Sequence, residues 1–256
     1  MTSKPNLLAR AIELRDAGRL FDPADAEMRD LFAGSIDRFC DIARRLRDSR
    51  RVLDVGAGHG MLLALLTELG HECAAVDAVD PMERHARVYR EHNIAFQRCN
   101  VEVEALPYAS ASFDAVVCCQ VLEHFTHSHL PAVRELHRVL RSGGVLEVDV
   151  PNVASLRNRS RMLRGRNITY DYVEHYLLAE PVLHAGRSFF PIRHNREFTR
   201  SELHTLLALA GFRSIEVDFL RSRRYRTGLA RLKGIGSALR DAWPSVRKSL
   251  IAFAEK

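Results

Sequence analysis

A glycine-rich turn holds the residues of this sequence that are best suited to bind a ligand. Gly56-Ala57-Gly58-His59-Gly60, the glycine turn, follows the apolar run 52–55 and precedes a helical pattern, the setting that a nucleotide-binding turn requires. Glycine has no Cβ, so the backbone can turn tightly and approach a ligand closely. A dinucleotide-binding turn has the spacing GxGxxG, whereas Met61 stands here where its last small residue would be. The pattern therefore favours a nucleotide ligand other than NAD.

A carboxylate follows the next apolar run. Asp77 directly follows the apolar run 72–76 and comes about 20 residues after Gly56. An acidic side chain at this place can accept hydrogen bonds from both hydroxyls of a ribose. The alternative is that Asp77 serves only the turn before Pro81. Given the glycine turn, we expect the ribose role.

Acid–base chemistry is indicated by a second loop, Gln120-Val121-Leu122-Glu123-His124, which follows the apolar run 113–118. Open parallel sheets bind ligands at the carboxyl ends of their strands, and histidine is suited to accept a proton at neutral pH. We therefore predict that His124 is a general base, with Glu123 and the distant His194 as further catalytic candidates. A structural histidine that caps the next helix is the alternative for His124.

Short apolar runs alternate with amphipathic helical patterns from residue 51 onward. This alternation predicts right-handed crossovers and a parallel sheet that helices cover on both faces. We expect strands at 52–55, 72–76, 94–98, 113–118, 145–150, 212–220 and 250–254, and helices at 61–69, 81–92, 131–140 and 199–210.

The patterns divide the chain into an N-terminal helical segment, residues 1–48, and a main domain, residues 49–256. Within the main domain, residues 152–197, called the insertion below, lack the rhythm of a helix or a strand. Irregular segments of this length in a compact domain usually have a function, so we expect the insertion to cap a substrate.

The composition is that of a globular protein, with 46% hydrophobic and 27% charged residues. The longest apolar run, residues 61–66, is far too short to span a membrane. The five cysteines form no CxxC pair, from which we expect a reducing, cytoplasmic location. Positive charge is concentrated in the second half, where residues 152–200 hold nine Arg against four acidic residues. This suggests either an anionic partner or a solvated basic face.

Over residues 51–150 the sequence resembles the class I S-adenosylmethionine-dependent methyltransferases, because four motifs occur in that family's order. The glycine turn is followed by Cys99-Asn100-Val101-Glu102, by a block at 106–117 and by a turn at 140–146. The resemblance implies an α/β fold with a Rossmann-like, doubly wound, seven-stranded sheet that is mostly parallel and has an antiparallel last strand. It also implies S-adenosylmethionine as cofactor and S-adenosylhomocysteine as product.

The resemblance implies a cofactor role for particular residues. Asp54 would bridge to the methionine ammonium through backbone or water. Asn100 would accept a hydrogen bond from the adenine amino group, at a position where many relatives have Asp. The loop with Glu123 and His124 would face the sulfonium and the acceptor. The implied cofactor-binding set is Asp54, Gly56, Ala57, Gly58, Gly60, Asp77, Ala78, Asn100, Val101, Glu102 and Gln120.

Residues 150–159 and 194–199 look like parts of methyltransferases encoded with cell-surface polysaccharide and glycolipid biosynthesis, in which an insertion after the fifth strand caps the acceptor. This implies methyl transfer to a hydroxyl of a glycan, a glycolipid precursor or a similar small metabolite. A phosphorylated acceptor could meet arginines bidentately, unless these form one solvated helix face. The candidates are Tyr170, Tyr172, His175, His194 and Arg196 for a sugar, and Arg157, Arg159, Arg161, Arg164 and Arg166 for a phosphate.

Other functions remain open. A nucleic-acid methyltransferase would fit the basic second half, but the sequence lacks the [DN]PP[YFW] tetrapeptide typical of amino-group methylation, so nucleic acid is disfavoured. A catalytically silent cofactor-binding scaffold could instead dock on a membrane through residues 221–248. A divalent metal ion held by Glu123 and His124 is not favoured, because Gln120 stands where a further carboxylate would help.

Overall fold

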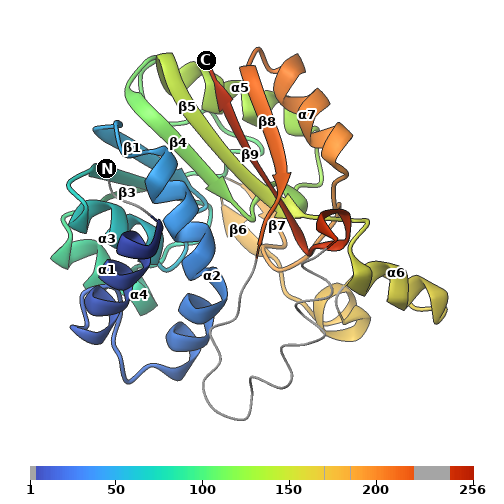
Figure 1. Cartoon of the computed structure of the whole chain (residues 1–256). Helices are drawn as coiled ribbons and strands as arrows, with labels where there is room; N and C mark the ends of the chain where they lie inside the picture. Colours follow the sequence, from blue (N-terminus) through green and yellow to red (C-terminus); the bar gives the residue numbers. More distant parts are fainter. Residues whose placement is uncertain (1–3, 170, 185, 222–242) are drawn as a thin grey trace.

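The computed structural model describes residues 4–169, 171–184, 186–221 and 243–256. Its main feature is a seven-stranded sheet with the strand order β3-β2-β1-β4-β5-β9-β8 (Figure 1). Strands β1 to β5 pair in parallel, and β9 lies antiparallel between β5 and β8. The predicted Rossmann-like sheet with an antiparallel last strand is therefore confirmed. The strands are β1 (Arg51–Val55), β2 (Glu72–Asp77), β3 (Ala95–Arg98), β4 (Phe113–Cys119), β5 (Leu140–Pro151), β8 (Arg213–Phe219) and β9 (Ser249–Glu255).

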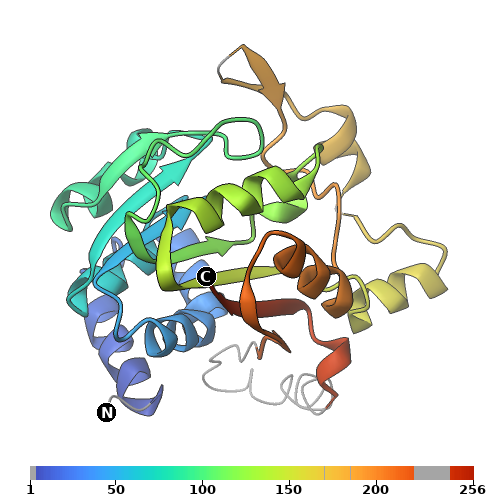
Figure 2. The same ribbon diagram turned by 90° about the horizontal axis from the view of Figure 1, so that it is seen from above.

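Helices cover both faces of this sheet (Figure 2). On one face, α5 and α7 share a core with β4 and β5 that includes Val133, Leu203 and Val148. On the other face, the N-terminal helices α1 and α2 pack with α3 against β1 and β4, through residues such as Phe32 and Val117. The helices are α1 (Lys4–Asp16), α2 (Ala26–Arg45), α3 (Met61–Glu68), α4 (Met82–Glu91), α5 (His129–Val139), α6 (Leu156–Leu163) and α7 (Arg200–Leu209).

The strand order reverses between β1 and β4, with β2 and β3 on one side and β5 on the other. Open parallel sheets bind ligands in the crevice outside the carboxyl ends of such strands. Strand β1 ends at Val55, just before the glycine turn, and β4 ends at Cys119. The segment after β4, residues 120–125, is called the histidine loop below. The fold therefore brings the two loops singled out in the sequence to neighbouring strands of one edge.

The insertion is more regular than its sequence pattern suggests. It contains α6, the π-helical turn η2 (Val173–Leu177) and a hairpin of β6 (Val182–His184) and β7 (Arg187–Phe189). The expectation of an irregular segment was wrong here, because α6 has no apolar stripe facing the core. Its N-cap Ser155 accepts a hydrogen bond from the Asn158 amide, and Asn158 is the buried residue of the helix.

Two other expectations differ from the structure or lie beyond it. The predicted helix at 131–140 ends at Val139, since Leu140 already pairs with Phe113 as the first residue of β5. Residues 222–242, most of the segment 221–248 considered above for membrane docking, lie outside the described residues. Among the described residues, no helix is long and apolar enough to cross a membrane.

A buried ion pair joins the N-terminal helices to the sheet. Arg38 on α2 places Nη1 3.1 Å from each carboxylate oxygen of Asp149, near the carboxyl end of β5. The Asp149 side chain is fully buried, and only 16% of the Arg38 side chain is exposed. Asp149 also accepts a hydrogen bond from the side chain of Gln120. The pair therefore connects α2 with β5 and with the start of the histidine loop.

Replacing Arg38 with Met should lower the free energy of unfolding by about 3 kcal/mol, because the Asp149 carboxylate would stay buried without its cation. Urea denaturation followed by circular dichroism at neutral pH would measure the change. The matched control is Arg44→Met, which removes an exposed pair with Asp41 on the same helix and should cost less than about 1 kcal/mol. Equal losses in the two variants would contradict the structural role of the buried pair.

Candidate active site

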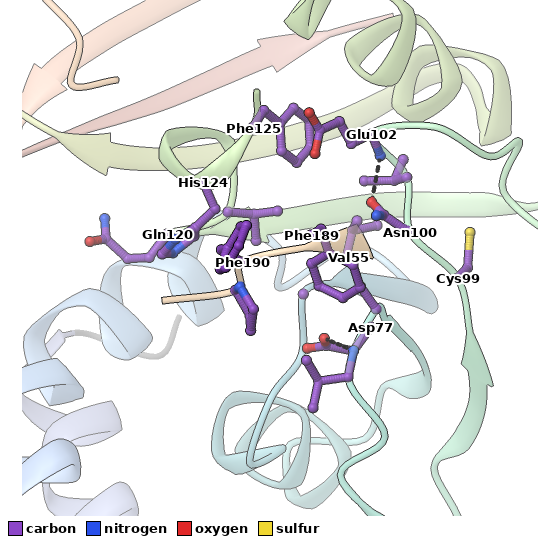
Figure 3. A pocket seen from close by; sticks show the side chains of 16 residues that line it. Val55, Asp77, Cys99, Asn100, Glu102, Gln120, His124, Phe125, Phe189 and Phe190 are labelled. Carbon is purple, nitrogen blue, oxygen red and sulfur yellow. Dashed lines mark hydrogen bonds between the residues drawn. The ribbon is translucent and has the colours of Figure 1, made fainter. Parts of the chain in front are cut away.

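A pocket of about 280 Å³ lies at the carboxyl edge of the sheet (Figure 3). The glycine turn, the segments after β2 and β3, the histidine loop and the hairpin of the insertion all contribute to its walls. Four of the predicted cofactor residues, Asp54, Ala57, Gly58 and Gly60, are not among the lining residues. The predicted cofactor residues that do line it are Gly56, Asp77, Ala78, Asn100, Val101, Glu102 and Gln120.

The glycine turn packs too closely for a side chain at two of its positions. Gly56 has a φ of +82°, and a Cβ there would lie 2.2 Å from Cγ2 of Val121 in the histidine loop. Gly60 has a φ of +74°, and a Cβ there would lie 3.0 Å from the Tyr89 ring of α4. The Tyr89 hydroxyl also donates a 2.8 Å hydrogen bond to the Gly58 carbonyl. These contacts hold the turn against two neighbouring elements, which explains the need for glycine.

Asp77 lies in the pocket wall at the end of β2, beside the glycine turn. Its Oδ2 accepts a 2.9 Å hydrogen bond from the Gly58 amide, and its Oδ1 accepts one of 2.9 Å from the Val79 amide. Burial raises the pKa of Asp77 above its ordinary value, although these backbone hydrogen bonds oppose the shift. A carboxylate held in this way has lone pairs left to accept ribose hydroxyls.

Asp54 on β1 is buried, with 4% of its surface exposed. Burial, followed by the negative charge of Asp77, raises the pKa of Asp54 to about 7. Its Oδ1 has no hydrogen-bond partner among the residues that the structure describes. Because a buried acceptor without a donor is costly, Asp54 is suited to a cationic group or a water molecule next to the glycine turn.

The side chains that follow β3 are partly committed to local structure. Asn100 Oδ1 accepts a 3.1 Å hydrogen bond from the Glu102 amide. Glu102 Oε1 accepts hydrogen bonds of 2.6 Å from the amides of Thr126 and His127. Burial raises the pKa of Glu102, but the hydrogen bonds from His127 and Thr126 outweigh burial and hold this pKa below its ordinary value. Glu102 therefore stays charged and ties the end of β3 to the segment before α5.

Gln120 begins the histidine loop in a left-handed conformation, with a φ of +55°. This conformation is unfavourable for a residue with a Cβ and needs support from its surroundings. The Gln120 amide donates a 2.9 Å hydrogen bond to the Asp149 carbonyl, and its side chain donates to the Asp149 carboxylate. The Arg38–Asp149 pair therefore holds Gln120 in the pocket wall.

His124 lines the pocket, and the structure brings His194 of the insertion next to it. The two rings meet edge to face, with centroids 4.9 Å apart. His124 Nδ1 lies 2.9 Å from the Arg193 carbonyl, which can only accept, so in the neutral ring Nε2 is the basic atom. Burial lowers the pKa of His124, and burial together with His124 lowers the pKa of His194 to about 4. Both rings are therefore neutral at pH 7.

Glu123, the third predicted catalytic residue, is fully buried. Neither Oε atom has a hydrogen-bond partner among the described residues, and burial raises the pKa of Glu123 well above its ordinary value. Ligand atoms of Glu123, His124 and His194 lie within 4.8 Å of one another, close enough to share a metal ion. However, one carboxyl group and two imidazoles fit Mg²⁺ or Ca²⁺ poorly, because these ions prefer several oxygen ligands.

The insertion covers the pocket with aromatic residues that no sequence motif indicated. Phe189, Phe190 and Pro191, which follow one another at the end of β7, line the pocket (Figure 3). The guanidinium carbon of Arg193 lies 3.2 Å from the centroid of the Phe190 ring. Only the aromatic content of the insertion hinted at this role, because no spacing rule marks an aromatic pair in an irregular segment.

Polar contacts fasten the insertion to the rest of the domain. His184 on β6 lies 2.8 Å from a carboxylate oxygen of Glu104. Asn195 donates two hydrogen bonds of 2.7 Å to the histidine loop, from its amide to the Glu123 carbonyl and from its side chain to the His124 carbonyl. The insertion therefore positions the histidine loop as well as covering the pocket.

The other described residues predicted for an acceptor are not among those that line the pocket. Tyr172 is 65% exposed, His175 Nδ1 lies 3.2 Å from the Ile192 carbonyl, and Arg196 pairs with Glu202. Tyr170 lies outside the described residues. The arginines divide into two groups: Arg157, Arg159 and Arg161 donate to backbone carbonyls of the insertion, whereas Arg164 and Arg166 are exposed.

Comparisons with known proteins identify a methyltransferase domain in this chain. A family model for a methyltransferase domain matches residues 25–217, more than half of the chain. A ubiquinone biosynthesis O-methyltransferase of Xanthomonas campestris pv. campestris (strain B100) is 32% identical over 139 residues, which cover 53% of this chain and 57% of that protein. Glycine N-methyltransferase of Oryctolagus cuniculus is 31% identical over 146 residues, 49% of each chain. The chain thus spans about half the length of these curated relatives.

Solved structures show the same fold. The 1,6-didemethyltoxoflavin-N1-methyltransferase of Burkholderia thailandensis, solved with 1,6-didemethyltoxoflavin and S-adenosylhomocysteine, has a TM-score of 0.55 and 22% identity, covering 98% of this chain and 87% of that one. A methyltransferase of Thermotoga maritima has a TM-score of 0.53 and 19% identity, covering 90% and 94%. With its sheet, its glycine turn and the family model in agreement, this chain belongs to the class I S-adenosylmethionine-dependent methyltransferases.

Proposed function

We propose that this protein transfers the methyl group of S-adenosylmethionine to a hydroxyl of a glycan, a glycolipid precursor or a similar small metabolite. The observation that carries the proposal is that Asp77, Asn100 and His124 line the same pocket, which Phe189 and Phe190 of the insertion cover. An oxygen acceptor is supported by relatives whose names are ubiquinone biosynthesis O-methyltransferases.

The nucleoside end of the cofactor would lie along the segments after β2 and β3. Asp77 would accept hydrogen bonds from the ribose hydroxyls, and Asn100 would accept a hydrogen bond from the adenine amino group. The methionine end would follow the glycine turn, where Asp54 offers Oδ1, which has no hydrogen-bond partner among the described residues, directly or through water to the ammonium group. The close contact between Gly56 and Val121 would then place the reacting sulfur near the histidine loop.

Methyl transfer is an in-line displacement, in which the bond from the acceptor oxygen to the methyl carbon forms as the bond from sulfur to that carbon breaks. S-adenosylmethionine supplies the methyl group on a positively charged sulfur. The main task of the protein is to hold the acceptor oxygen about 3–3.5 Å from that carbon and in line. His124 Nε2 would take the hydroxyl proton as the oxygen attacks, because Nδ1 already donates to the Arg193 carbonyl.

The aromatic cover favours an acceptor with an apolar face. Phe189 and Phe190 line the pocket from the insertion, and such rings pack well against the C–H face of a sugar or against another flat ring. A phosphate on the acceptor would have to reach Arg164 or Arg166, because the other three arginines of the run already bind carbonyls.

Asp77→Ala should weaken the binding of S-adenosylhomocysteine by about 10- to 100-fold, because hydrogen bonds to a charged group contribute about 1.5–3 kcal/mol. Isothermal titration calorimetry would measure the affinity, with circular dichroism to check that the variant is folded. Asp218→Ala, an exposed carboxylate on β8 away from the pocket, is the control and should bind like the wild type. Unchanged affinity in Asp77→Ala would remove the ribose role.

His124→Gln should lower kcat by about 10²- to 10⁴-fold, the usual contribution of a general base, while the affinity for S-adenosylhomocysteine stays within about threefold. Because burial lowers the pKa of His124, the neutral base should persist below the ordinary histidine pKa of about 6.5. The kcat/KM of the wild type should therefore fall only under that pH as the ring gains its proton.

Steady-state kinetics from about pH 5 to 8, with the best acceptor from a panel of glycans and hydroxylated metabolites, would show both effects. His204→Gln, on the exposed side of α7, serves as the control. A His124→Gln variant that keeps full activity, or that keeps the acid limb of the profile, would show that another group takes the proton.

Chelation of divalent ions with EDTA should leave methyl transfer unchanged, because the Glu123–His124–His194 cluster offers a single carboxyl group, whose pKa burial raises well above its ordinary value. The rate would be compared before and after dialysis against EDTA. A loss of activity that Mg²⁺ restores would instead make this cluster a metal site.

A further inference from the structure

The insertion has an inverted polarity. Among the described residues of the insertion, the buried side chains are all polar: Asn152, Ser155 and Asn158. In most soluble proteins the large apolar side chains are buried and the polar side chains are exposed. The exposed large hydrophobic residues of the described chain are Leu31, Val79, Leu209 and Trp243 outside the insertion, against Leu156, Met162, Leu163, Tyr172, Val173, Leu177, Leu178, Leu183 and Ile192 within it.

The turn η2 shows this inversion in a single element. Its polar side chains point to the protein, since the Tyr176 hydroxyl donates a 2.6 Å hydrogen bond to the His194 carbonyl and His175 contacts the Ile192 carbonyl. Residues 172, 173, 177 and 178 form the exposed face of this turn, and the Tyr172 ring stacks on the Tyr176 ring with centroids 6.1 Å apart. That face is apolar and solvent-exposed: Tyr172 is 65%, Val173 52%, Leu177 58% and Leu178 72% exposed.

The end of α6 repeats the arrangement, and Figure 1 shows this helix projecting from the body of the molecule. Met162 is 65% and Leu163 88% exposed, and the exposed Arg164 and Arg166 follow directly. Two apolar side chains and two cationic ones therefore lie close together at the end of α6.

The charge of the insertion indicates which partner suits it. Residues 152–197 hold eight Arg against four acidic residues, a net charge of +4. Five of these arginines lie within residues 157–166, on and just after α6, whereas the exposed Asp171, Glu174 and Glu180 lie in or beside η2. Met162 and Leu163 next to Arg164 and Arg166 therefore suit the interface of an anionic bilayer, where apolar groups enter the acyl boundary and guanidinium groups meet phosphates. The exposed apolar side chains of η2 would add buried area to that contact. A second copy of this chain suits the end of α6 less, because a symmetric contact there would bring the arginines of both copies together.

We propose that the insertion docks on an anionic phospholipid bilayer through η2 and the end of α6. The same insertion supplies Phe189 and Phe190 to the pocket, so docking would bring the pocket close to amphiphilic acceptors that lie in the bilayer. The evidence for docking is the exposed apolar and cationic residues of the insertion, whereas the choice of a lipid-linked acceptor rests on the proposed function.

Flotation with vesicles would test the docking, with the full chain and without cofactor or acceptor. Vesicles of phosphatidylcholine with about 30 mol% phosphatidylglycerol would be compared with vesicles of phosphatidylcholine alone. We expect the wild type to bind the anionic vesicles at least about tenfold more tightly, and added salt to weaken this binding. Leu177→Ser/Leu178→Ser, Met162→Ser/Leu163→Ser and Arg164→Glu/Arg166→Glu should each reduce the binding by about tenfold or more.

Matched controls change the same residue types outside the insertion. Leu209→Ser on α7 removes a leucine that is 62% exposed, and Arg90→Glu on α4 reverses an exposed arginine. Both should bind vesicles like the wild type. Residues 222–242 are the same in all variants, so their charge cannot account for a difference between them.

Three results would overturn the docking: variants of the insertion that float like the controls, wild-type binding that is equal with and without phosphatidylglycerol, or a dimer in sedimentation that the insertion variants dissociate. The docking and the proposed function can fail separately. Flotation that depends on the insertion would support the docking even if no hydroxyl acceptor is methylated, and calorimetry with S-adenosylhomocysteine would show that the variants keep the cofactor site.

Discussion

One buried carboxylate connects the three parts on which the site depends. Asp149 near the end of β5 receives Arg38 from the N-terminal helices and Gln120 from the histidine loop, away from solvent. In this low-dielectric position the ion pair cannot exchange its partners for water at little cost, so its geometry is imposed on both neighbours. Gln120 keeps its left-handed backbone, and the loop that follows reaches the pocket wall with His124. The N-terminal helices are thus coupled to the chemistry of a pocket that they do not line.

Sequence patterns predicted the parts of the site that lie next to strand ends. The glycine turn and Asp77 are identified by residue type and by distance along the chain from an apolar run, and the structure places Gly56, after β1, and Asp77, at the end of β2, in the same pocket. Their positions follow from local geometry, because parallel strands of similar length end at the same edge. The sheet itself was predictable for the same reason, since alternating strands and helices allow few topologies.

The remaining part of the site depends on long-range packing, which no local pattern encodes. His194 meets His124 only because Asn195 binds the histidine loop, and Phe190 reaches the pocket only through the course of a hairpin. Arg38 gave no signal either, because an arginine on an amphipathic helix is usually solvated. The helix α6 escaped prediction because its buried side chain is Asn158, so the 3.6-residue rhythm that marks helices in water is missing.

The walls of the pocket are drawn from residues 55 to 191, across four parallel strands and the insertion. No short stretch of the described chain carries the whole binding site, so a ligand held there would be bound by the folded state alone. Its binding free energy would then add to the stability of the whole sheet by mass action, rather than to that of one loop. A high concentration of cofactor would in this way raise the free energy of unfolding, and depletion of the cofactor would lower the stability of the entire domain.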